Sequence, residues 1–130
     1  MSNRAIKDVY SLTTIINPAA GKTSTTTSSA LDMANSEANI FMIHHGAITD
    51  GTHTPKLQEC ATSGGTYTDV AAADQVGTFA AITSSTTAGT FQKVSYIGNL
   101  RYIKLVVTVS GTTTGGFYTA TMLQRLRKQP

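Results

Sequence analysis

The segment from Phe91 to Ser110 constrains the fold more than any other part of the sequence. It contains two runs in which apolar and polar residues alternate, and a Gly98-Asn99 pair lies between them. Alternation with a period of two is the pattern of a half-buried β-strand, and a turn of this kind between two such runs is typical of a β-hairpin. We therefore predict a hairpin, with Tyr96 and Tyr102 as a cross-strand aromatic pair.

The second of these runs assigns its residues to two faces. One face carries Ile103, Leu105, Val107 and Val109, and the other carries Tyr102, Lys104, Val106 and Thr108. Burial of the four apolar side chains is worth roughly 1.5–3 kcal/mol each before conformational entropy is subtracted. We expect this hairpin to be the folding centre and its first face to be core.

Composition extends the β prediction to the whole chain. Thr and Ser fill about a quarter of the 130 residues, and only 13% are charged. Such residues suit strands and turns, and seven or eight short strands at intervals of about ten residues are typical of sandwiches and barrels. We predict an all-β fold, an antiparallel β-sandwich that is jelly-roll-like. The domain spans residues 11–126, with an N-terminal arm at 1–10 and a basic C-terminal tail at 127–130.

Three more segments carry strand signals. Residues 38–46 are mostly apolar on both faces, which predicts a central strand covered on both sides. An Asp50-Gly51 turn signal then leads into residues 54–60, and we expect these to complete a second hairpin. Residues 76–83 are expected to form another strand.

The distribution of charge and apolar residues argues against nucleic acid or a membrane as a partner. Much of the net charge of +3 comes from Arg125, Arg127 and Lys128, whereas a nucleic-acid surface needs basic residues along one face with aromatics between them. No stretch approaches the roughly 18 apolar residues of a membrane span, and a secretory signal is not seen. Cys60 is the only cysteine, which favours synthesis in a reducing cytoplasm.

The motifs that resemble catalytic or cofactor sites fail on their spacing. Gly21-Lys22-Thr23 resembles the end of a phosphate-binding loop, but Ile16 occupies the position of the required first glycine. His44 and His45 are adjacent on an expected strand and so point to opposite faces, where they do not bind one metal ion together. The seven carboxylates are scattered, mostly in expected turns. We expect no enzyme activity, no metal and no cofactor.

Three segments, taken in order, resemble a known family. They are DGTHTPKLQE at 50–59, GGTYTDV at 64–70 and VSYIGNLRYIKLVVTVSGTTTGG at 94–116. They resemble a family of small structural proteins of tailed bacteriophages and prophages, over residues 48–122. The sequence departs from the family pattern at 60–62 and at Lys104.

The resemblance implies a component of the virion that is made in the cytoplasm of the bacterial host. The expected function is that of a capsid decoration or cement protein, which stabilises the head by bridging subunits of the major capsid protein. Head-completion and tail-associated roles are the alternatives. Related strand pairs also occur in discoidin-like jelly rolls that bind carbohydrate or lipid. A carbohydrate-binding module on the virion surface is therefore the rival from another class, although the chain has no Trp.

Basic residues are the candidates for contact with a partner. They are Arg4, Lys7, Arg101, Arg125, Arg127 and Lys128. We expect the arm and the tail to contact neighbouring subunits, the arm becoming ordered on binding. Arg101 has a second interpretation, in which it pairs with a local carboxylate and orients the hairpin. We also expect a homo-oligomer, a trimer ahead of other states, because closed symmetry multiplies weak contacts.

Overall fold

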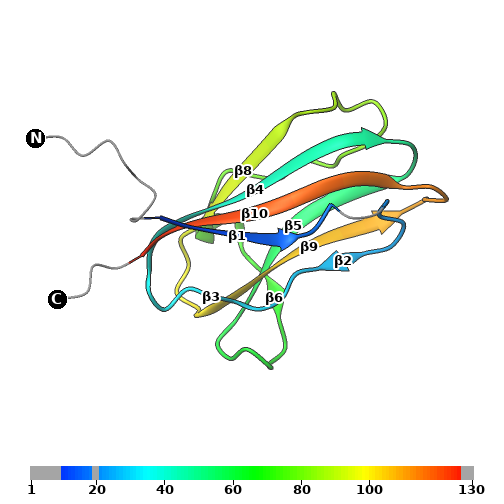
Figure 1. Ribbon diagram of the computed structural model, residues 1–130. Coiled ribbons are helices and arrows are strands. Elements are labelled where there is room, and N and C mark those ends of the chain that lie inside the picture. The colour runs from blue at the N-terminus through cyan, green and yellow to red at the C-terminus, as the bar shows by residue number, and fades with distance from the viewer. Residues whose placement is uncertain (1–9, 19–20, 127–130) are drawn as a thin grey trace, which may run out of the picture.

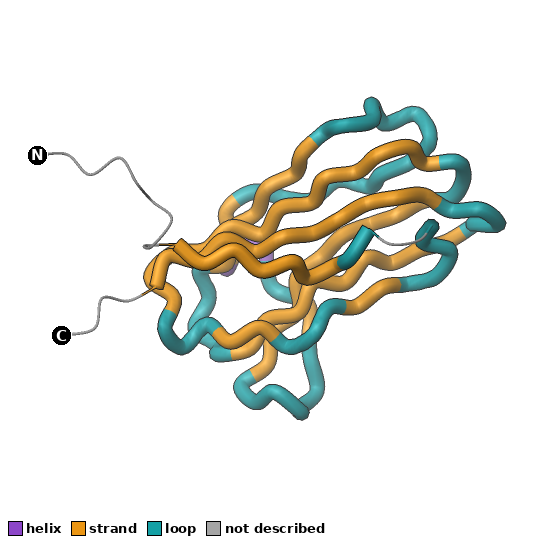
Figure 2. Tube along the Cα trace, in the orientation of Figure 1, coloured by secondary structure: helices purple, strands orange, loops and turns teal. Residues whose placement is uncertain are grey.

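Two antiparallel sheets packed face to face make up the structure, a computed structural model that describes residues 10–18 and 21–126 (Figures 1 and 2). The predicted all-β sandwich is confirmed. The expected arm and tail lie outside the described residues except for Tyr10, which is the first residue of a strand.

Each sheet has a defined strand order. Sheet A runs β1 (Tyr10–Ile16), β10 (Gly116–Leu126), β4 (Ser36–Ile48), β8 (Phe91–Tyr96) and β7 (Gln75–Val76). Sheet B runs β2 (Thr26–Thr27), β9 (Tyr102–Ser110), β5 (Thr52–Cys60) and β6 (Thr68–Asp69), and β3 (Leu31–Asp32) also pairs with β9. A 3₁₀ turn, η1 (Ala72–Asp74), precedes β7. The first and last strands are therefore neighbours, with Tyr10 opposite Arg125.

The core lies between the sheets and is built from every second residue of the long strands. On β9, Ile103, Leu105 and Val107 are fully buried and Val109 is partly buried, which confirms the predicted face. From sheet A, Phe41 and Ile43 of β4 meet them across the gap. The alternation of the sequence is therefore explained by one face of each sheet covering the other.

The predicted hairpin at Gly98-Asn99 is wrong, although both of its strands exist. β8 belongs to sheet A and β9 to sheet B, so the chain crosses between the sheets at this point (Figure 1). Tyr96 and Tyr102 are consequently not cross-strand neighbours, and Tyr102 lies opposite Cys60 of β5 and Asp32 of β3. A turn signal shows that the chain reverses direction. It does not show whether the next strand returns within the same sheet or crosses to the facing one, since an apolar face is buried in either case.

The second predicted hairpin is wrong for the same reason. Around Asp50-Gly51 the chain passes from β4 in sheet A to β5 in sheet B. The expected strand at 76–83 is also largely wrong, since only Val76 lies in β7 and Ile82 makes an isolated bridge to His53. Residues 38–46 do form a central strand, between β10 and β8, but the outward face of that strand is only half-buried.

Candidate interaction surface

The outward face of sheet A carries apolar side chains in register on three strands. Leu12 of β1 lies opposite Leu123 of β10, and Leu123 lies opposite Ile40 of β4. Their chain neighbours Met122 and Phe41 point into the core, so the three side chains point away from it. Leu12 is 68% exposed. We call Leu12, Leu123 and Ile40 the apolar row.

Aromatic side chains continue this face beyond the apolar row. Phe91 of β8 is 59% exposed and stacks on the ring of His44, with ring centroids 4.2 Å apart and an interplanar angle of 8°. Phe117, at the start of β10, is also exposed. The residues of the apolar row together with His44, Phe91 and Phe117 are called the sheet A face below.

The outward face of sheet B is different, because its polar groups are paired with one another. The carboxylate of Asp69 lies 3.0 Å from Lys56 Nζ and accepts a hydrogen bond from Gln58 Nε2 at 2.9 Å. The hydrogen bond from Gln58 makes the larger contribution and the contact with Lys56 the smaller one, and together they lower the pKa of Asp69. Lys104 Nζ lies 4.3 Å from the ring centroid of Tyr67. Burial of this face against a partner would desolvate several charges, whereas burial of the sheet A face would mainly remove apolar surface from water, with Lys93 the exposed charge on β8 beside it.

The structure describes two of the six predicted partner-binding residues. The guanidinium of Arg101 forms a bidentate pair with Asp32, at 2.9 Å from Nε and 2.8 Å from Nη2. A carboxylate partner agrees with the second interpretation of Arg101, but Asp32 is distant in the sequence and β8 and β9 form no hairpin for the pair to orient. Arg125 lies 3.6 Å from Glu37. The remaining four, Arg4, Lys7, Arg127 and Lys128, lie outside the described residues. The two described arginines are thus engaged within the chain.

The Arg101–Asp32 pair gives a prediction about pH. The hydrogen bond from Arg101, followed by that from the Ala34 N–H, lowers the pKa of Asp32 to about 2. A carboxyl whose pKa is lower in the folded chain contributes stability above its ordinary pKa and loses that contribution as the pH falls towards its folded pKa. We expect Arg101→Gln to lower the melting temperature at pH 7, because it removes the partner of the Asp32 carboxylate. The decrease should be only a few degrees, because both side chains are about half exposed. The deficit should shrink as the pH falls from about 4 to about 2. A deficit unchanged by pH in thermal melts would contradict this assignment.

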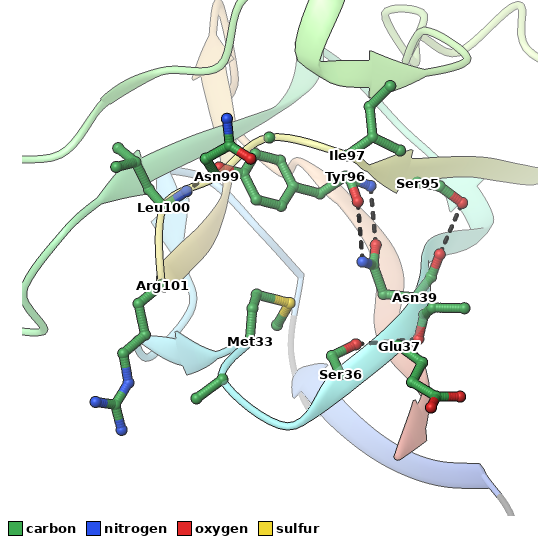
Figure 3. A pocket seen from close by; sticks show the side chains of 13 residues that line it. Met33, Ser36, Glu37, Asn39, Ser95, Tyr96, Ile97, Asn99, Leu100 and Arg101 are labelled. Carbon is green, nitrogen blue, oxygen red and sulfur yellow. Dashed lines mark hydrogen bonds between the residues drawn. The ribbon is translucent and has the colours of Figure 1, made fainter. Parts of the chain in front are cut away.

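An open pocket with a volume of about 610 Å³ lies where the chain crosses from β8 to β9 (Figure 3). Its polar groups bond to one another. The Asn39 amide donates to Tyr96 O at 3.0 Å and accepts from Tyr96 N at 2.8 Å, and Ser95 Oγ donates to Asn39 O. The Tyr96 hydroxyl donates to Glu59 of sheet B at 2.7 Å and accepts from Leu100 N. These bonds hold the crossing in place.

The three histidines do not converge on one position. His44 points outward and His45 inward, as the alternation predicts. His53 is also buried and lies 3.4 Å from the Tyr118 hydroxyl and 3.2 Å from Asp50 O. His45 Nδ1 bonds to Gly46 O at 3.0 Å. Within residues 10–18 and 21–126, no three His, Cys, Asp or Glu side chains come together as metal ligands would.

Asp50 stabilises a turn, which agrees with its place in the Asp50-Gly51 turn signal of the sequence. Its carboxylate accepts backbone hydrogen bonds from Thr113, Thr114 and Gly115, at distances between 2.6 and 3.2 Å. These bonds lower the pKa of Asp50, and the bond from the Gly115 N–H makes the largest contribution. The carboxylate therefore ties the β4–β5 connection to the β9–β10 turn.

Comparison with protein-family models, with curated proteins and with solved structures finds no match for this chain. In the described part of the chain, no helix has the length and hydrophobicity that crossing a bilayer requires.

Proposed function

We propose that this chain is a structural protein of a tailed-bacteriophage virion, most specifically a capsid decoration or cement protein that binds the major capsid protein through the sheet A face. The observation that carries the proposal is the outward face of sheet A, which has the apolar row towards one end, with Leu12 exposed and Ile40 and Leu123 half-buried, and the exposed rings of Phe91 and Phe117 towards the other. A cement protein derives its binding energy from buried area, and interface cores are apolar and rich in aromatic residues. The resemblance of residues 48–122 to phage structural proteins supports the same function.

The jelly-roll description of the fold belongs to this proposal. The strand pairs are nested along the chain: β1 pairs with β10, β2 with β9, β4 with β8 and β5 with β6. Nested pairs of this kind arise when one long hairpin is wrapped into two facing sheets, and jelly rolls of two sheets occur in viral capsid proteins. The strand order supports the assignment.

The test uses purified virions from the phage or prophage genome that encodes the chain. We expect the protein in the particles at a stoichiometry related to that of the capsid subunit, and lower thermal stability of the heads when the gene is deleted. A second experiment adds the purified protein back to particles from the deletion strain. Phe91→Glu and Phe117→Glu should each abolish binding to these particles. Thr54→Glu and Thr108→Glu, exposed positions of sheet B, should leave it unchanged. Absence from virions, or equal binding by all four variants, would overturn the proposal. Microscopy of the particles separates the head from the tail position.

One observation favours carbohydrate binding as a second function. Phe91 offers an exposed aromatic face that is supported from behind by His44. Aromatic rings of this kind are the surfaces on which sugar rings stack. Glycan-array binding that Phe91→Ala abolishes, together with unchanged assembly of particles, would favour this function over the structural one.

A further inference from the structure

One edge strand of the two sheets, β1, is much longer than the others. A strand at an edge presents unpaired N–H and C=O groups, and proteins protect such edges with very short strands, charges or proline. In the described residues, the edge strands β2, β3, β6 and β7 each contain two residues, whereas β1 contains seven. β1 pairs with β10 on one side, and no described strand pairs with its other side (Figure 1).

The far side of sheet A shows how an edge of this protein is closed. Beyond the short β7, the side chain of Gln92 on β8 replaces a strand partner. Its Oε1 accepts from Ala80 N at 2.7 Å, and its Nε2 donates to Ala80 O at 3.0 Å. No comparable side-chain pairing covers the outer edge of β1 within the described residues.

The sequence of β1, YSLTTII, also lacks the usual protection. It contains no charged residue, no glycine and no proline. Leu12 is the most exposed large apolar side chain among the described residues, and Thr13 and Thr14 are exposed too. The register shifts between Thr14 and Ile16, which limits the regular edge to Tyr10–Thr14.

We propose that this edge pairs with the β1 edge of a second copy, antiparallel and around a twofold axis, so that two A sheets become one continuous sheet. Because β1 carries no charge, self-pairing places no like charges opposite each other. Among the described residues, β1 is the one long edge strand without such protection, so pairing consumes it and the assembly closes as a dimer. The twofold axis also joins the two apolar rows end to end through Leu12. The pairing concerns copies of this chain in solution and does not depend on the proposed function.

The test measures the mass of the full chain by sedimentation from about 1 μM to about 1 mM, a range that includes weak dimers. We expect a monomer–dimer equilibrium. Leu12→Lys and Thr13→Lys each place a charge at the edge and should raise the dissociation constant at least about tenfold. Val76→Lys is the matched control, because Val76 is an exposed apolar residue on the opposite edge of the same sheet. It should leave the dissociation constant unchanged.

Amide hydrogen exchange of the unmodified chain gives a second readout that needs no variant. We expect exchange at the β1 amides that point away from β10 to slow as the protein concentration rises, and exchange in β7 to stay constant. A monomer at all concentrations, a trimer, or a dimer that responds equally to Leu12→Lys and Val76→Lys would overturn the proposal. Protection of those β1 amides at every concentration would do so as well, since it would mean that the chain covers its own edge.

Discussion

Replacement of Gly115 with alanine is expected to prevent stable folding. The φ angle of Gly115 is 77°, in the left-handed region, and a Cβ built there would overlap the carbonyl group of Lys22. The clash is with backbone, so no side-chain rotation relieves it. Movement of the turn would break the bond from Gly115 N to Asp50, at 2.6 Å, and that from Thr49 N to Gly115 O, at 2.8 Å. Strain, clash and lost bonds act together at this position.

Gly111→Ala is the matched control, because Gly111 lies in the same turn region and has a φ of 68° but open space around its Cβ position. Left-handed backbone at alanine costs about 1–2 kcal/mol, which sets the expected loss for the control. Gly115→Ala should lose at least about 4 kcal/mol, which is exceptional for one substitution, or fail to fold. Urea unfolding of both variants measures the difference. Equal losses would show that the turn moves freely away from Lys22.

Leu105→Ala is expected to have the next largest effect. Leu105 is fully buried on β9 and contacts the core from the middle of sheet B. Truncation of a fully buried leucine loses transfer free energy and leaves a cavity, and the usual range is about 2–5 kcal/mol. A loss near the upper end is expected, because strands on both sides of β9 and the facing sheet restrict collapse of the cavity.

Thr108→Ala, three residues along the same strand, is the control for that variant. Thr108 is exposed on the outward face of β9, and surface substitutions usually change stability by less than about 0.5 kcal/mol. Denaturant midpoints of the two variants, with equal slopes, give the comparison. A loss for Thr108→Ala that matched or exceeded the loss for Leu105→Ala would mean that the two faces of β9 have been assigned the wrong way round.

The sequence predicts the local features of this fold well, namely which face of a strand each side chain occupies. The faces of β9 and the opposite directions of His44 and His45 follow from a period of two, and the apolar residues on both faces of 38–46 indicate the central position of that strand. Which strands pair does not follow from it. The turn at Gly98-Asn99 has the same local signal whether the chain returns within one sheet or crosses to the other, and the burial of Tyr96 between the sheets decides for the crossing.

The candidate surface was harder to predict than the fold. Leu123 could be assigned to one face of its strand from the sequence, but its neighbours Leu12 and Ile40 come from β1 and β4, and only the register brings them together. The partner of Arg101 shows the same limitation. One of its two interpretations is pairing with a local carboxylate, but Asp32 lies far away in the sequence and no local pattern links the two.

The pairing of β1 with β10 has a consequence for how the chain is made. Synthesis is vectorial, and β10, which fills the space between β1 and β4, follows both of these strands in the sequence. A nascent chain that has reached Ser110 holds Leu12 and Phe41 on strands with no neighbour between them. Sheet A therefore closes only after β10 has been synthesised, so its contacts with β1 and β4 form later than the contacts among the strands that precede it.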